Sequence, residues 1–122
     1  MPRILVIDDE ESIRDLLRTM LEREGYDVLD ASNGAEGIKL CVNDPADLVI
    51  TDIIMPEKDG METIVEIRRE FPDTKIIAIS GGDRVEPGAY LEMAKKLGAQ
   101  DTFTKPFERE EILAAVRNLI GE

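Results

Sequence analysis

Short apolar runs alternate along this chain with longer segments that carry apolar residues three or four positions apart, and this alternation limits its fold more than any other feature. The short runs have the length of buried strands and cover residues 3–7, 27–31, 48–51, 75–79 and 101–104. The spacing in the longer segments is that of one face of a helix. Because parallel strands need crossover helices between them, we expect an α/β fold in which helices cover both faces of a mostly parallel sheet.

Residues that favour helix ends divide the longer segments. Gly25 ends the first expected helix, Asn33 caps a second that runs through Asn43, and Gly98 closes the fourth. The segment 80–88 is rich in glycine and aspartate, so we expect an irregular loop there. The apolar positions that we expect to face the sheet are Ile13, Leu16, Leu17, Met20 and Leu21, then Met61, Ile64 and Val65, then Tyr90, Met93, Ala94 and Leu97, and finally Ile112, Leu113, Val116, Leu119 and Ile120.

The composition removes several classes of function. A net charge of −12 over 122 residues repels nucleic-acid phosphates, so we expect no direct binding of nucleic acid. The absence of histidine excludes Ser-His and Cys-His nucleophile pairs and histidine metal ligands. Cys41 is the single cysteine, and we expect it to pack as a buried or half-buried side chain in a protein of the reducing cytoplasm. We expect neither a membrane span nor a signal peptide, because no apolar run is long enough for the first and the opening residues lack the pattern of the second.

Polar residues follow four of the expected strands at the point where each strand ends. They are Asp8, Asp9 and Glu10 after the first strand, Asp52 after the third, Ser80 after the fourth and Lys105 after the fifth. Each has an ordinary explanation when taken alone, such as a helix start, loop chemistry or a surface lysine. Because the carboxyl ends of parallel strands meet at one edge of a sheet, we expect these side chains to converge there. For Glu10, a place beside a metal site and a simple helix start both remain open.

Converging carboxylates repel one another, and this repulsion calls for cations. Two unit charges about 4 Å apart cost on the order of 4 kcal/mol at an effective dielectric constant of about 20. Lys105 supplies one positive charge, and a hard divalent ion held by oxygen ligands supplies a second, with Mg²⁺ or Mn²⁺ favoured over zinc. Asp52 stands alone at its strand end, which makes it the expected nucleophile toward phosphorus. Asp8 and Asp9 suit the metal, and Ser80 offers a hydroxyl donor.

Four motifs occur together on the expected elements. They are Ile7-Asp8-Asp9-Glu10, Asp52-Ile-Ile-Met-Pro-Glu-Lys-Asp-Gly60, Ser80-Gly81 and Lys105-Pro106-Phe107. In this combination the chain resembles the receiver domain of bacterial two-component response regulators over its whole length, so we expect residues 1–122 to form one such domain. The resemblance implies a three-layer, doubly wound flavodoxin-like fold with strand order 2-1-3-4-5.

The same resemblance implies a signalling function. The phosphoryl group would come from a phosphohistidine on a sensor histidine kinase or phosphotransfer protein. The signal would pass to a partner or fused output domain through the surface of the fourth helix, fifth strand and fifth helix. Such a domain accepts a phosphoryl group and loses it slowly, and is not an enzyme in the usual sense.

The resemblance also assigns roles to residues around the expected nucleophile. Asp52 would be the phosphoacceptor and a metal ligand. Asp9 would bind Mg²⁺ directly, and Asp8 mainly through water. The backbone carbonyl of Ile54 would be a further ligand.

Further positions are assigned to the response. Ser80 and Lys105 would contact the phosphoryl group, and Ser80 with Phe103 would form the conformational switch. A cis peptide bond is implied before Pro106. The chain departs from the commonest pattern of these domains where Phe103 lacks a tyrosine hydroxyl and where the segment 82–88 is longer than usual. It departs again at Ile54, which is apolar where many of these domains carry a polar side chain beside the phosphoryl group.

Three alternatives use the same residues differently. A Mg²⁺-dependent phosphatase resembling haloacid dehalogenases would also have an aspartyl nucleophile, but it would carry Asp-x-Asp after the first strand. A flavodoxin-like FMN carrier would have a first loop rich in serine, threonine and glycine, whereas this one is acidic. A receiver-like interaction module that no longer needs phosphorylation is disfavoured by the complete set of acids, serine and lysine.

Overall fold

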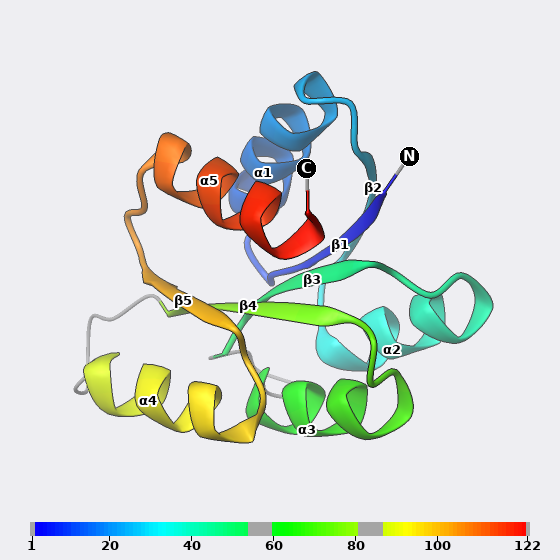
Figure 1. The fold of residues 1–122 in the computed structure, drawn as a ribbon, viewed down its shortest axis with the longest axis vertical. Helices are drawn as coiled ribbons and strands as arrows, with labels where there is room; N and C mark the ends of the chain where they lie inside the picture. The colour runs from blue at the N-terminus through cyan, green and yellow to red at the C-terminus, as the bar shows by residue number, and fades with distance from the viewer. Residues whose placement is uncertain (1, 54–59, 81–86, 122) are drawn as a thin grey trace.

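The described residues form strands and helices in strict alternation. The structure is a computed structural model that describes residues 2–53, 60–80 and 87–121 (Figure 1). The elements are β1 (Arg3–Ile7), α1 (Glu11–Arg23), β2 (Asp27–Ala31), α2 (Gly34–Asn43), β3 (Leu48–Asp52), α3 (Gly60–Glu70), β4 (Lys75–Ser80), α4 (Pro87–Leu97), β5 (Asp101–Thr104) and α5 (Arg109–Ile120). No helix in these ranges is both long and apolar enough to cross a membrane.

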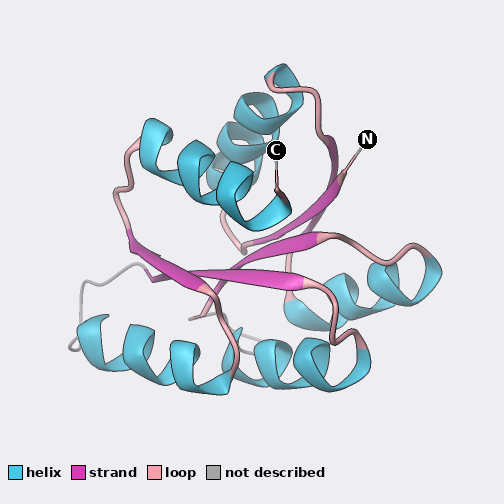
Figure 2. Ribbon diagram, in the orientation of Figure 1, coloured by secondary structure: helices cyan, strands magenta, loops and turns pink. Residues whose placement is uncertain are grey.

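The strands pair in parallel into one sheet with the order β2-β1-β3-β4-β5. Helices α1 and α5 cover one face of this sheet, and α2, α3 and α4 cover the other (Figure 2). This confirms the predicted three-layer, doubly wound α/β fold and its strand order. Strand order reverses between β1 and β3, so the carboxyl ends of these two strands lie at the place where such sheets bind ligands.

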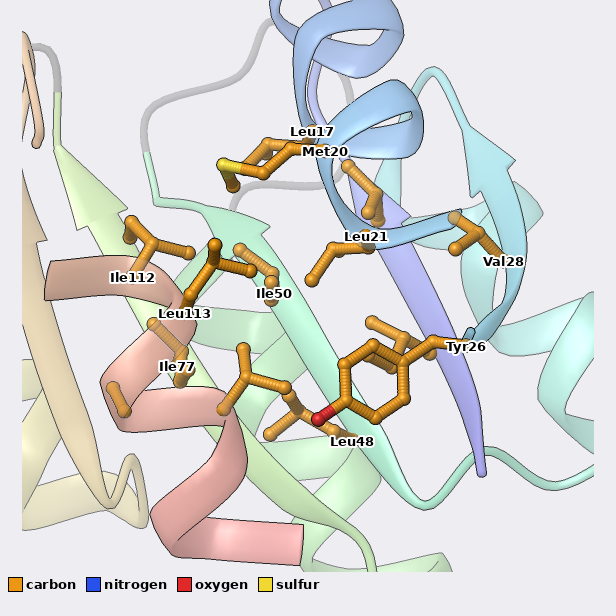
Figure 3. Close-up of a cluster of buried hydrophobic side chains, with 14 of the residues drawn as sticks. Leu17, Met20, Leu21, Tyr26, Val28, Leu48, Ile50, Ile77, Ile112 and Leu113 are labelled. Atoms are coloured by element: carbon orange, nitrogen blue, oxygen red, sulfur yellow. The ribbon is translucent and has the colours of Figure 1, made fainter. Parts of the chain in front are cut away.

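Two hydrophobic cores lie on the two faces of the sheet, and strands β1 to β4 each contribute to both. In β1, Ile4 and Val6 belong to the core under α1 and α5, whereas Leu5 and Ile7 belong to the core under α2, α3 and α4. Figure 3 shows side chains of the first core converging from α1, α5 and the strands. Burial on both faces explains why the strands read as unbroken apolar runs. Cys41 is buried in the second core as predicted, and burial raises the pKa of its thiol.

Three of the predicted core positions are wrong. Leu16, Val65 and Met93 expose 52%, 41% and 51% of their surface. Each directly precedes or follows a fully buried residue on its helix. Neighbours in a helix point roughly 100° apart, so only one of the pair can face the sheet. The apolar pattern alone did not say which one.

Two strands extend one residue further than predicted, and one helix begins earlier. Asp52 is the last residue of β3 and Ser80 the last residue of β4. The backbone ladder continues at this edge, because Lys105 N–H donates to the Ser80 carbonyl at 2.8 Å. Helix α4 begins at Pro87, so the end of the expected loop 80–88 is helical, in keeping with the preference of proline for a first helical turn.

Candidate functional site

Acidic side chains gather where β1 and β3 end. Carboxylate oxygens of Asp8, Asp9, Glu10 and Asp52 all lie within 4.8 Å of one another. Asp8 and Asp52 are buried, whereas Asp9 and Glu10 are exposed. The cluster therefore has two carboxylates fixed in the protein and two that reach into solvent.

The turn after β1 is held by several hydrogen bonds. The Asp8 N–H donates to the Ala31 carbonyl at 3.1 Å, which extends the pairing of β1 with β2. Asp8 Oδ1 accepts from the Glu10 N–H at 2.9 Å, an arrangement that lets aspartate shape its own turn. The Arg14 guanidinium donates to the Asp8 carbonyl at 2.7 Å. One loop thus receives its shape from the sheet, from its own side chain and from the first turn of α1.

Arg14 is a site residue that the sequence analysis missed. In the sequence, Arg14 falls among the polar positions of α1. Its side chain is long enough for the guanidinium to reach back to the Asp8 carbonyl at the edge of the sheet. A useful signal would have been a long cation in the first helical turn after an acidic pair.

Lys105 is the cation at the centre of the cluster. Its Nζ lies 2.9 Å from Asp8 Oδ2, 3.0 Å from Glu10 Oε1 and 3.2 Å from Asp52 Oδ2. The peptide bond from Lys105 to Pro106 is cis, as predicted. Burial opposes the charged form of Lys105, but hydrogen bonds to Asp8 and Glu10 and the charge on Asp52 outweigh it and raise the pKa of the amine.

The cluster keeps an excess of negative charge. Burial raises the pKa of the Asp8 carboxyl, although the Glu10 N–H and the Lys105 ammonium favour its ionised form. Among the described residues, the one ammonium within hydrogen-bond distance offsets only part of the charge on four carboxylates. The donor set consists of hard oxygen atoms, the kind that Mg²⁺ prefers. The residues present therefore fit a divalent cation.

Ser80 carries a buried hydroxyl beside this cluster. Its β4 neighbour Ile79 pairs with Asp52, so the two polar residues end adjacent strands. The side chain is fully buried, and Oγ has no hydrogen-bond partner among the described residues. Buried polar atoms are nearly always paired, so this hydroxyl is ready to donate to a ligand.

Phe103 does not lie where a switch with Ser80 requires it. Its ring packs against the core under α1 and α5, and its strand partner is Ile79 of the same core. Ser80 follows Ala78 in the alternation of β4, on the face under α3 and α4. Thr102 pairs with Ala78 and shares that face. The prediction that Phe103 swings toward Ser80 is therefore wrong. It depends only on the distance of Phe103 from Lys105 in the sequence, whereas the pairing of β5 with β4 decides which face Phe103 occupies.

Two further sequence predictions fall outside the described residues. They are the backbone carbonyl of Ile54 as a metal ligand and most of the longer loop at 82–88.

Comparisons with known proteins agree on one family. The family model described as "Response regulator receiver domain" matches residues 4–117. The alkaline phosphatase synthesis transcriptional regulatory protein PhoP of Bacillus subtilis is 39% identical over 118 residues, which are 97% of this chain and 48% of that protein. The chain thus spans about half the length of this curated relative.

Solved structures give the same result. A response regulator receiver domain protein from Clostridium thermocellum has a TM-score of 0.90 and 32% identity, covering 99% of this chain and 95% of that one. The response regulator TrrA from Thermotoga maritima, crystallised in complex with Mg²⁺-BeF, has a TM-score of 0.86 and 37% identity, covering 98% and 99%. Nothing in these matches favours the phosphatase, FMN-carrier or interaction-module alternatives.

Proposed function

This chain belongs to the response-regulator receiver domain family, and from that premise we propose that it accepts a phosphoryl group on Asp52. The observation that carries the proposal is the position of this carboxylate. Asp52 is buried at the end of the central strand, and its Oδ2 lies 3.2 Å from the Lys105 ammonium. A carboxylate beside a fixed cation can attack phosphorus, because the approaching negative charge is partly neutralised.

The transfer balances without a further reactant. A carboxylate oxygen of Asp52 forms a bond to phosphorus, the bond from phosphorus to the donor's histidine nitrogen breaks, and its electron pair leaves with the imidazole. Lys105 neutralises charge on the phosphoryl oxygens, and the hydroxyl of Ser80, which has no partner among the described residues, donates a hydrogen bond to one of them. The donor is a histidine kinase or phosphotransfer protein.

Carboxylates of Asp8, Asp9 and Asp52 are the groups that we propose to hold Mg²⁺, with Mn²⁺ as a second hard ion that this donor set accepts. When bound, the ion supplies positive charge beside the phosphoryl oxygens. The complex of the Thermotoga maritima protein with Mg²⁺-BeF supports this proposal. The Ile54 carbonyl remains part of the proposed ligand set.

We propose that the chain passes its signal to an output partner or a fused domain in the cytoplasm. The match to about half of a transcriptional regulatory protein supports a fused arrangement. Slow loss of the phosphoryl group would end the signal. The acidic surface makes direct contact of this part of the chain with nucleic acid unfavourable.

Phosphorylation at Asp52 is tested with acetyl phosphate and intact mass spectrometry. We expect a gain of one phosphoryl group in the presence of Mg²⁺ and none in chelator. Asp52→Asn should show no gain, because the amide is a poor nucleophile. Asp15→Asn removes an exposed carboxylate of α1 and should react like the wild type. A phosphoryl group on Ser80, or one that survives Asp52→Asn, would contradict the assignment.

The conformational response should run from Ser80 toward α4 and β5. We expect beryllofluoride with Mg²⁺ to shift amide NMR signals of Ser80, Thr102 and residues 92–97, because Ser80 moves to meet the new acceptor oxygens. Thr102→Ala should reduce the shifts in α4, whereas Phe103→Leu, on the other face, should leave them in place. Shifts confined to residues next to Asp52 would mean that the site works without this switch.

A further inference from the structure

The Lys105 ammonium is already surrounded by carboxylates before any phosphoryl group arrives, and it donates hydrogen bonds to Glu10 and Asp52. An ammonium has three N–H donors. Its Nζ lies within 3.2 Å of three different carboxylates, those of Asp8, Glu10 and Asp52. In the proposed function Lys105 must also contact a phosphoryl oxygen, and that oxygen has to compete with these carboxylates for the ammonium.

The contact with Glu10 is the least costly one to break. The side chains of Asp8 and Asp52 are only 1% and 5% exposed, so water cannot easily replace a lost partner there. The side chain of Glu10 is 58% exposed, and water can take over its hydrogen bond. An exposed ion pair of this kind contributes little to stability.

The Glu10 side chain has no other assigned role in the described structure. Its backbone starts α1, with the carbonyl accepting from the N–H groups of Ile13 and Arg14 at 3.1 Å. Its side chain makes no capping hydrogen bond to the helix. The carboxylate instead accepts a hydrogen bond from Lys105, which directly follows β5 and lies 95 positions away in the sequence. The backbone of Glu10 therefore starts α1, whereas its side chain binds Lys105.

We propose that Glu10 is a positioning residue that occupies, on Lys105, the place taken by a phosphoryl oxygen after modification. This inference rests on the proposed function at Asp52. Glu10 holds the ammonium at the site in the unmodified protein and competes with the incoming anion for one N–H donor. The carboxylate thereby weakens binding of the phosphoryl group, and its removal should strengthen it.

The competition is tested by the affinity for beryllofluoride at saturating Mg²⁺. Glu10→Ala removes the acceptor, and Glu10→Gln keeps the shape but loses the charge. We expect both to bind beryllofluoride roughly two- to fivefold more tightly than the wild type, the range expected for an exposed ion pair, with alanine giving the larger effect. Glu11→Gln is the matched control, because it removes an exposed carboxylate one residue away that has no contact with Lys105. It should change the affinity less than the Glu10 variants do, because its carboxylate acts on the site only at longer range.

A second readout follows Lys105 directly. In the metal-free protein, the ¹⁵N NMR signal of the Lys105 ammonium should move in both Glu10 variants and stay in place in Glu11→Gln. The affinity for Mg²⁺ should change less than the affinity for beryllofluoride. The proposal is overturned if the Glu10 variants bind beryllofluoride no more tightly than Glu11→Gln. It is also overturned if their main effect is weaker Mg²⁺ binding, which would make Glu10 part of the metal site.

Failure of this inference is distinguishable from failure of the proposed function. If Asp52→Asn abolishes the beryllofluoride response while the Glu10 variants behave like the control, only the role of Glu10 is wrong. If Asp52→Asn still responds, the proposed function itself is wrong, and the inference about Glu10 is overturned with it.

Discussion

Gly60→Ala should lower the free energy of unfolding by about 3 kcal/mol, as expected when an atom is forced into a filled core. A Cβ on Gly60 would overlap the backbone carbonyl of Asp52 and the Cα of Ile53. Backbone cannot rotate away as a side chain can, so either the first turn of α3 or the end of β3 must move. Urea denaturation of the wild type and the variant measures the change.

The same substitution should also impair the site. The overlap falls on the carbonyl of Asp52, so moving β3 displaces the nucleophile from Lys105. We expect beryllofluoride to bind roughly tenfold more weakly or worse, because small misplacements of reacting groups are costly.

Gly37→Ala is the matched control for Gly60→Ala. Gly37 also lies in a helix and is also tightly packed, but there the overlap is with Cδ1 and Cγ1 of the Ile7 side chain, and a side chain can shift where backbone cannot. The gain in helix propensity offsets part of the cost, so stability should change by about 1 kcal/mol or less. Equal losses for both variants would show that the close approach of α3 to β3 has no special importance.

The fold was predictable from the sequence because its dominant cause is local. A strand buried on both faces reads as an apolar run, and a helix on a sheet reads as a stripe. Asn33 illustrates how far such signals reach, because its side chain accepts from the Glu36 N–H as a helix cap should. Asp52 and Ser80 were predictable site residues for a similar reason, since strand ends in a parallel sheet meet at one edge.

The predictions that failed depend on the pairing register of the strands and on how far long side chains extend, and neither can be read from the sequence. Phe103 and Thr102 are adjacent in β5, and only pairing with β4 decides which faces Ser80. Arg14 joins the site through the length of its side chain. Gly60 lies close to β3 because of the way α3 packs on the sheet. The sequence alone does not indicate this close approach, because a glycine at this position is equally typical of a turn.

Lys105→Ala should lower the free energy of unfolding of the metal-free protein by about 2 kcal/mol. The substitution removes the ammonium that lies 2.9 Å from Asp8 Oδ2 and 3.2 Å from Asp52 Oδ2, both on buried carboxylates. Removing one member of a buried ion pair is costly because the remaining charge stays out of water. Thermal melting in chelator measures the loss. Adding Asp52→Asn should recover part of the lost stability, because it removes one of the two buried negative charges. A double variant no more stable than Lys105→Ala would contradict this account.

The effects of Lys105→Ala on two ligands should have opposite signs. The ammonium and a divalent cation neutralise the same carboxylates, so without Lys105 the cluster is more negative and Mg²⁺ should bind more tightly. Beryllofluoride is an anion that needs the ammonium, so its binding should become too weak to detect. Titration of each ligand on the same variant separates the two roles of Lys105. A parallel loss of both affinities would mean that the substitution had disrupted the whole site, whereas opposite changes would show that Lys105 competes with the metal and cooperates with the phosphoryl group.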